Sequence, residues 1–356
     1  MSVSFDACAA WVFAIFAFVG ESARIVVLYP LTPMQRLWIP FVITSGLIGA
    51  WVYVRSTPRE ERGAGLRGVA GFLFPASVWR HRSSWVDLCY FFPHQMVRIW
   101  IYGAFSAALT LRVATWTQGT WEARFGVDPL LAGVDSLGVR VGFTLIAFVL
   151  IDLTAYLAHL MAHKVPFLWE FHRVHHSARV LNPLTTYREH PVENLLFAAA
   201  ASGSTGVLFG SLFALFGAVP TPLGLLGIGV PMLLFNSVGY HLRHSHVWLR
   251  WPGVWGIVFG SPAHHQIHHS CLPEHIDKNL AFAFPIWDRI FGTLCLPDDR
   301  PEMVFGIGDG SEPQYDGFLR IYALPFERLF ERYVRAPLAE GRLARPLAPV
   351  RSRRSR

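Results

Sequence analysis

The longest uncharged run in the chain limits what the chain can fold into. Residues 195–240 form 46 consecutive positions without Asp, Glu, Lys or Arg, whereas a helix needs only about 20 apolar residues to cross a bilayer. Pro220, Thr221 and Pro222 lie near the middle of the run, where two prolines favour a turn. The sequence therefore predicts a hairpin of two membrane spans, near 195–218 and 223–240.

Other apolar stretches predict further spans, near 37–54, 95–115 and 139–158. Residues 7–20 are also apolar, but no basic segment precedes them and charged residues follow at once. They predict a further span or an interfacial helix rather than a signal peptide. Charged residues make up 15% of the 356 positions and apolar residues 53%, whereas soluble domains carry about 25% charged residues. We expect an all-α protein, a polytopic integral membrane helical bundle with about 4–5 spans.

The distribution of arginine predicts the orientation of this bundle. Six arginines lie in the loop between residues 55 and 82, and such loops stay on the cytoplasmic side. Alternation of the spans then places residues 159–194, and everything after Tyr240, on that side as a histidine-rich helical cap. We divide the chain into an N-terminal membrane region (1–137), a histidine-rich domain (138–295) and a C-terminal cytoplasmic extension (296–356).

The extension ends in an arginine-rich tail, with six arginines in the last fifteen residues. The tail is either a solvated end or a segment attracted to anionic lipid headgroups. Nucleic acid is not an expected partner, because no basic patch interleaved with aromatic residues and no known reader motif accompanies the tail.

Histidine is concentrated in about a third of the chain. Of 16 histidines, 14 lie between His159 and His275, just beyond the ends of predicted spans. The spacings H-x-x-x-H and H-x-x-H-H place their members on one face of a helix. The hexapeptides HRVHHS (172–177) and HQIHHS (265–270) are nearly identical. The four clusters are His159 and His163; His172, His175 and His176; His241, His244 and His246; and His265, His268 and His269.

These clusters predict a metal site. Neutral imidazole is a ligand suited to iron, zinc, copper and nickel. A lone histidine near a membrane surface is more often an ordinary polar residue, but repeated boxes at one membrane face are not explained in that way. One ion takes about four to six ligands, so about eight to ten convergent histidines suit two ions. The zinc protease motif H-E-x-x-H is absent from the sequence.

The order of the boxes resembles the fatty acid hydroxylase/sterol desaturase superfamily of membrane oxygenases. The resemblance covers about residues 140–295. It rests on residues 152–177, 187–194, 261–270 and 277–294, the last of which contain a W-D-x-x-F-G-T signature. The sequence departs from the family pattern at Leu160, where arginine usually follows the first box histidine. It departs again at Leu280 and Ala281, where Tyr-Gly is frequent.

The resemblance implies a dinuclear metal site, taken to be two iron ions, that activates O2 and hydroxylates or desaturates a lipid such as a sterol or a fatty acyl chain. The box histidines would be the ligands. His244 is favoured over His246, and His265 over its neighbour His264. The implied metal ligands are His159, His163, His172, His175, His176, His241, His244, His265, His268 and His269.

Two further residues are predicted to support catalysis. Asp152 lies in a span about two turns before His159, where it would accept the outer N–H of a ligand imidazole or serve helix packing. His190 matches a recurrent His-Pro of the family and is expected behind the ligands or facing the substrate. Weaker candidates for the outer acids are Glu170, Glu189, Glu193, Glu274, Asp277 and Asp288.

Substrate and electrons must reach this site. The uncharged segments 251–263 and 280–287 are expected to line an apolar channel for the lipid, or to rest on the membrane. The sequence contains no recognisable electron-transfer domain, so electrons are expected from a separate protein. The main hypothesis is a membrane-bound oxidoreductase of lipid biosynthesis. The alternatives are a histidine-rich metal transporter, which would hold ionisable residues near the bilayer midplane, and a zinc-dependent membrane hydrolase.

Overall fold

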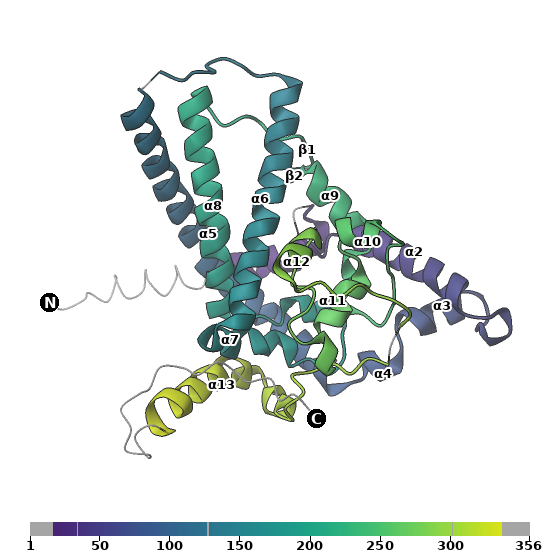
Figure 1. Ribbon diagram of the computed structural model, residues 1–356. Coiled ribbons are helices and arrows are strands. Elements are labelled where there is room, and N and C mark those ends of the chain that lie inside the picture. The colour runs from purple at the N-terminus through teal and green to yellow at the C-terminus, as the bar shows by residue number, and fades with distance from the viewer. Residues whose placement is uncertain (1–16, 34, 127, 301, 337–356) are drawn as a thin grey trace.

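The computed structural model describes residues 17–33, 35–126, 128–300 and 302–336. Most of the apolar stretch 7–20 and the whole arginine-rich tail lie outside these ranges. Within them the chain forms helices and loops, with one isolated bridge and one hairpin of two short strands, β1 (Gly224–Leu225) and β2 (Ile228–Gly229). The all-α prediction is therefore confirmed (Figure 1).

Three long helices form the bundle. α5 (Arg82–Phe125), α6 (Leu137–Lys164) and α8 (Pro191–Phe216) run side by side (Figure 1). Small residues allow α5 and α8 to approach closely, because a Cβ atom at Gly206 would lie 2.7 Å from Cβ of Val113, and one at Gly210 would overlap the carbonyl oxygen of Ala114. Small residues at such contacts are typical of helices that pack within a bilayer.

Four helices of the described part are long and apolar enough to cross a membrane: α5, α6, α8 and α2 (Ile39–Ser56). They coincide with the spans predicted near 95–115, 139–158, 195–218 and 37–54.

The structure differs from the fifth predicted span, near 223–240. This segment forms β1, β2 and α9 (Val230–Ser237), and the 8 residues of α9 rise only about 12 Å, less than half of a bilayer core. Leu226 and Gly227 adopt positive φ angles of 53° and 80°, which turn the chain tightly and prevent a continuous helix. The second span of the predicted helical hairpin is therefore not formed as a continuous helix.

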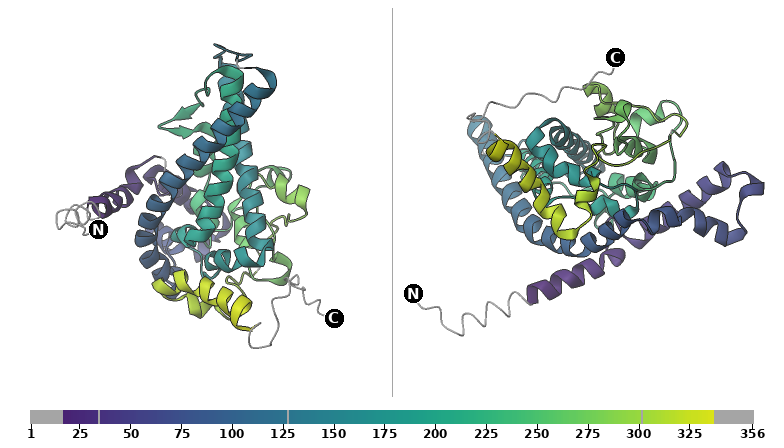
Figure 2. Two further views of the ribbon diagram at one scale, coloured as in Figure 1. Left: turned by 90° about the vertical axis from the view of Figure 1, so that its left-hand side faces the viewer. Right: turned by 90° about the horizontal axis from the view of Figure 1, so that it is seen from below.

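The N-terminal helices lie to one side of the bundle. α2 and α3 (Gly65–Leu73) project sideways, and α4 (Ala76–Trp79) leads back to α5 (Figure 2). α2 is attached to the rest of the protein through Val52, which packs on Leu242, Val247 and Leu249. This contact supports the segment that carries His244.

Short helices gather around the lower half of α6 (Figure 1). Those that carry or flank the histidine boxes are α7 (Pro166–His176), η3 (Pro183–Tyr187), η4 (Tyr240–His244), α10 (Trp255–Val258), α11 (Pro262–His268) and α12 (Ile286–Phe291). The remaining short elements are η1 (Tyr29–Leu31), η2 (Arg59–Glu61), η5 (Pro273–His275), η6 (Glu312–Tyr315) and the π-helical turn η7 (Glu331–Arg335).

The C-terminal extension packs on the histidine-rich domain through α13 (Phe318–Phe330). Ile321 and Leu324 of α13 share a buried cluster with Tyr90 of α5 and Val174 of α7. The carboxylate of Glu170 is buried on α7 and lies 3.1–3.3 Å from guanidinium nitrogens at 173, 328 and 332. The extension therefore packs against α7, the helix that carries HRVHH, and stabilises its position.

Candidate metal centre

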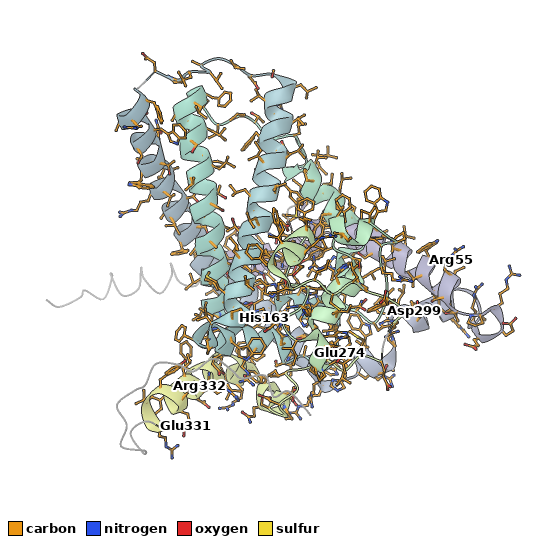
Figure 3. The ribbon with its side chains drawn as sticks, in the orientation of Figure 1. Arg55, His163, Glu274, Asp299, Glu331 and Arg332 are labelled. Carbon is orange, nitrogen blue, oxygen red and sulfur yellow. The ribbon has the colours of Figure 1, made fainter. Side chains whose placement is uncertain are left out.

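The nine histidine side chains that converge come from four separate segments. The last turns of α6 supply two of them, and Figure 3 marks His163 at the lower end of this helix. α7 and η4 supply four more, and α11 with its C-cap residue supplies three. α11 begins at a capping box in which the Ser261 hydroxyl accepts from the backbone N–H of His264, and this fixes where the helix starts.

The histidines divide into two groups. In each group one ring nitrogen per residue lies within 4.8 Å of every other. We call them group A and group B. Group A consists of His159, His163, His172, His176 and His268. Group B consists of His175, His244, His265 and His269.

The H-x-x-H-H spacing explains how two groups are built from repeated boxes. The first and last histidines of a box are four residues apart and share a helix face. In HRVHH this pair joins group A and the middle residue, His175, joins group B. In HQIHH the pair joins group B and the middle residue, His268, joins group A. Each box thus contributes to both groups, and the rings of His176 and His268 lie 4.6 Å apart between centroids.

Within group A the nitrogens face one another at short range. Nε2 of His172 lies 3.1 Å from Nε2 of His159, 3.1 Å from that of His163 and 3.2 Å from that of His176. Nε2 of His268 is buried and has no hydrogen-bond partner among the described residues. In group B, Nε2 of His244 lies 2.9–3.4 Å from the corresponding atoms at 175, 265 and 269.

In group A, the opposite ring nitrogens of four histidines are held by fixed acceptors. Nδ1 of His159 donates to the Leu280 carbonyl (2.7 Å), and Nδ1 of His268 donates to the Lys278 carbonyl (3.1 Å). The other acceptors in group A are carboxylates, namely Glu193 at 2.7 Å from Nδ1 of His172 and Asp277 at 3.1 Å from Nδ1 of His163. A neutral ring that donates from Nδ1 presents a lone pair at Nε2. Group A therefore directs several lone pairs toward one point.

Burial keeps these rings neutral. Loss of solvent lowers the pKa well below its ordinary range for His172, His176, His244, His265, His268 and His269. Neutral lone pairs that face one another at about 3 Å repel, and a cation between them removes the repulsion. Nitrogens about 2.0–2.1 Å from one ion would lie about 3.0–3.4 Å apart. The donor set of group A therefore fits a metal ion, and the Nε2 atoms of group B have the same spacing.

Asp152, the aspartate predicted to accept from a ligand imidazole or to serve helix packing, forms its hydrogen bonds with a loop. Within the described ranges it has no hydrogen bond to a histidine. Its carboxylate accepts from the backbone N–H groups of Ala283 (2.7 Å) and Phe284 (3.1 Å) and from Nε1 of Trp287 (2.9 Å). It fixes the loop before α12, because a buried carboxylate satisfies the free N–H groups of that loop.

Asp288 completes this loop. Its carboxylate accepts from the backbone N–H groups of Leu280 (2.7 Å) and Ala281 (3.0 Å). The carbonyl of Leu280 in turn receives Nδ1 of His159. Asp288 and Asp152 therefore position a ligand candidate through the backbone and not by direct contact.

Two predicted histidines lie outside both groups. Nε2 of His241 contacts the Arg36 carbonyl (2.9 Å), so this ring turns away from the centre on η4. His190 caps α8, with Nδ1 accepting from the Val192 N–H (3.1 Å) and Nε2 donating to the Tyr322 carbonyl (3.2 Å). Burial lowers the pKa of His190 to about 4. It lies between the start of α8 and α13.

The structure also brings residues to the site that the sequence did not indicate. The carbonyls of Leu280 and Lys278 carry no side-chain signature. The Thr186 hydroxyl lies 2.8 Å from Nδ1 of His244. Arg243 lies 3.2 Å from Nδ1 of His265 through a terminal guanidinium nitrogen, which can only donate. Of these residues, Arg243 could have been found from the sequence, because it is a charged residue within the histidine cluster HLRHSH.

Comparison with known proteins agrees with this geometry. Residues 144–293 match the sequence profile of the family described as "Fatty acid hydroxylase". This range contains every histidine of groups A and B. It is a fatty acid hydroxylase domain. No solved structure matches the chain significantly.

Three relatives with different named activities are similar in sequence to this domain. An alkylglycerol monooxygenase of Caenorhabditis elegans is 27% identical over 49% of this chain and 31% of its own length. An ornithine lipid hydroxylase of Rhizobium tropici is 29% identical over 51% of the chain and 50% of its own length. The human cholesterol 25-hydroxylase is 32% identical over 42% of the chain and 50% of its own length. The chain spans about a third of the length of the alkylglycerol monooxygenases that it matches.

A large apolar cavity lies next to group B, and Arg243 connects the two because it lines the cavity and contacts His265. Its volume is about 850 Å³, and both segments expected to line a channel, 251–263 and 280–287, contribute to its wall. Leu145 of α6 and Leu234 of α9 line its far side. The cavity also explains how the segment near 223–240 can be irregular, because non-helical backbone at membrane depth is tolerated where it borders a cavity.

The carboxyl group on His172 provides a test of whether the domain holds metal through group A. Glu193→Gln replaces the carboxyl group that orients this ring, and loss of such a partner costs about 10–100-fold in metal affinity. We expect that loss when metal is titrated out with a chelator. The matched control is Glu189→Gln, because Glu189 lies near the same helix start but pairs weakly with Arg98 at 3.8 Å. Equal metal retention by the two variants would contradict the assigned role of Glu193.

Proposed function

We propose that this protein is a membrane-bound, iron-dependent oxygenase that inserts oxygen into a lipid, with His159, His163, His172, His176 and His268 binding one ion and His175, His244, His265 and His269 binding the other. The observation that carries the proposal is the pair of buried imidazole groups beside an apolar cavity.

Iron is the metal proposed for both groups. When bound, it would supply the activation of O2 that no side chain can provide. The chain's own residues hold the ligand rings in place through Glu193, Asp277 and backbone carbonyls. Neutral ligands suit a cation that must keep open positions, because they leave its charge uncompensated.

The relatives support a lipid as the substrate. Their names refer to alkylglycerol, ornithine lipid and cholesterol, which are all hydrophobic or amphipathic molecules. The apolar cavity suits the same class, because burial of an acyl chain or a ring system favours binding by roughly 25 cal/mol per Å² of apolar surface. Hydroxylation is proposed in preference to desaturation on the strength of these names.

The proposal includes a side of the membrane and a partner. The positive-inside distribution of arginine supports a cytoplasmic location for both groups. Electrons would come from a separate donor protein. The position of group A at the end of α6 disfavours a metal transporter, which would hold its site near the bilayer midplane.

The test measures the source of the inserted oxygen. Full-length protein in membranes is loaded with Fe(II) under anaerobic conditions, supplied with a reductant and exposed to isotopically labelled O2, and the lipids are analysed by mass spectrometry. We expect a lipid that gains one labelled oxygen atom. Zinc-loaded protein serves as the control and should be inactive. Product formed without O2, or labelled from water, would overturn the proposal and favour a hydrolase.

A further inference from the structure

A single charged residue lies in the wall of the apolar cavity. Arg243 is 6% exposed, and the other lining residues are aliphatic, aromatic, Gly, Pro or Ala. Its guanidinium donates to the Phe282 carbonyl (2.7 Å) and to Nδ1 of His265 (3.2 Å), and it lies 4.6 Å from the centre of the Phe282 ring. Arginine has five N–H donors, so these two contacts leave donors for a ligand in the cavity.

No carboxylate of the described chain forms an ion pair with this guanidinium, whose polar contacts are the two just given, although buried charges are ordinarily paired. A second arginine increases the imbalance. The guanidinium carbon of Arg36 lies 5.7 Å from the centre of the Tyr240 ring and 5.9 Å from that of Phe282, which are also the rings beside Arg243. Arg36 likewise forms no ion pair within the described ranges. Two guanidinium groups without a carboxylate at ion-pair distance in the described ranges therefore lie against the same pair of rings, and one of them, Arg243, lines the apolar cavity.

Part of the cavity wall is exposed at the surface of the protein. Leu145, Leu234 and Trp255 line it and are 52%, 60% and 56% exposed. Leu145 belongs to α6, which is apolar enough to span a membrane. An apolar chain can therefore extend from the cavity between α6 and α9 toward the bilayer.

We propose that the cavity binds an amphiphile with one anionic group, a carboxylate or a phosphate, which lies on Arg243 while the apolar chain extends between α6 and α9. The inference rests on the proposed function and narrows its substrate class. Because Arg243 contacts His265 of group B, an anionic end held there brings the carbons next to it close to that group. The substrate is then a lipid oxidised near its acidic end.

The test compares ligands that differ only in the head. Hexadecanoate, hexadecyl phosphate and hexadecanol are titrated into the full-length protein in a neutral detergent, at a pH at which both acids are ionised. A charge-assisted contact is worth about tenfold or more in affinity, so both acids should bind wild-type protein at least about tenfold more tightly than the alcohol. Acetate and inorganic phosphate, which lack the chain, should bind far more weakly than either acid.

The variants identify the residue responsible. Arg243→Gln should remove the preference for acids and leave the affinity for hexadecanol unchanged. Arg243→Lys should keep part of the preference for acids. Arg36→Gln should weaken this preference. The matched control is Arg250→Gln, which removes an arginine that is 46% exposed and pairs with Asp299 at 3.5 Å. This variant should keep the preference for acids. Equal binding of acid and alcohol by wild-type protein would overturn the proposal even if no variant folds. Equal weakening of both ligands by Arg243→Gln would also overturn it and assign Arg243 to the support of His265.

This experiment is independent of turnover. It needs neither O2 nor a reductant, so acid-selective binding by a protein that inserts no oxygen would refute the proposed function alone. Oxygen insertion into a lipid without acid-selective binding would refute the inference about Arg243 alone.

Discussion

His176→Ala and His269→Ala should each abolish oxygen insertion, with one variant depleting the metal of group A and the other that of group B. His176 lies 3.2 Å from His172 between Nε2 atoms, and His269 lies 3.0 Å from His244. Alanine removes one inward lone pair and leaves a cavity that water can enter. The loss of activity should exceed the about 10–100-fold effect of removing a residue that merely supports a ligand. Metal analysis of purified protein, with oxygen insertion assayed in parallel, checks both effects.

The controls are histidines of the same segments that lie outside both groups. His246 is two residues from His244, and its ring packs on Phe72 with 5.2 Å between centroids. His264 is next to His265, and its Nδ1 lies 2.7 Å from the Ser261 hydroxyl. His246→Ala and His264→Ala should keep the metal of both groups. If they lose as much metal as the group variants do, the assignment of ligands to groups A and B is wrong.

These controls also show how far the sequence predicts the site. Helical spacing within each box is a local property, so the periodicity indicated that the box histidines lie close together on a helix. It did not indicate that the middle histidine of each H-x-x-H-H box joins the other group. The choice of His244 over His246 and of His265 over His264 agrees with where the structure places these rings. His241 has the same residue type and a similar position in the chain, but η4 is a 3₁₀ helix that turns its ring toward Arg36. Such a turn is not encoded in box spacing.

The residues behind the ligands were less predictable. Asp152 was expected beside a ligand because an acid in a span is costly, and it is indeed buried, but backbone N–H groups compensate it. The carbonyls of Leu280 and Lys278 act through the path of a loop, and any residue type offers a carbonyl. Contacts of this kind follow from tertiary structure and not from composition.

The missing fifth span has a similar cause. The apolar run over 195–240 was long enough for two helices, and its length dominated the prediction. Gly224, Gly227 and Gly229 within it favour a turn, and the pairing of Leu225 with Ile228 places β1 against β2 there. Hydropathy indicates whether a segment prefers an apolar environment. It does not indicate whether the segment is helical, and closely spaced glycines disfavour a helix.

The second large effect is expected at a buried ion pair behind α7. Arg188 and Asp87 are each 1% exposed, and Nε of Arg188 donates to the Asp87 carboxylate at 2.5 Å. The same guanidinium donates to the Ser177 hydroxyl (3.1 Å) and to the Ser83 carbonyl (2.7 Å). The pair therefore joins the start of α5 to the residue that follows HRVHH.

Asp87→Ala should lower the free energy of unfolding by about 3–5 kcal/mol, because it leaves a buried guanidinium without its counter-charge. Thermal and denaturant unfolding of the protein in detergent measures this change, and metal content should fall with it as the end of α7 loses its support. Asp87→Ala combined with Arg188→Met should recover part of the loss, since both charges are then absent. The matched control is Arg82→Ala, which breaks a 3.2 Å pair with Asp316 in which Arg82 is 72% exposed, and pairs of this kind contribute about 0–1 kcal/mol. If Asp87→Ala is no more destabilising than Arg82→Ala, the buried pair does not hold α5 against α7, and the histidines of that helix must be positioned by α6, α8 and α13 instead.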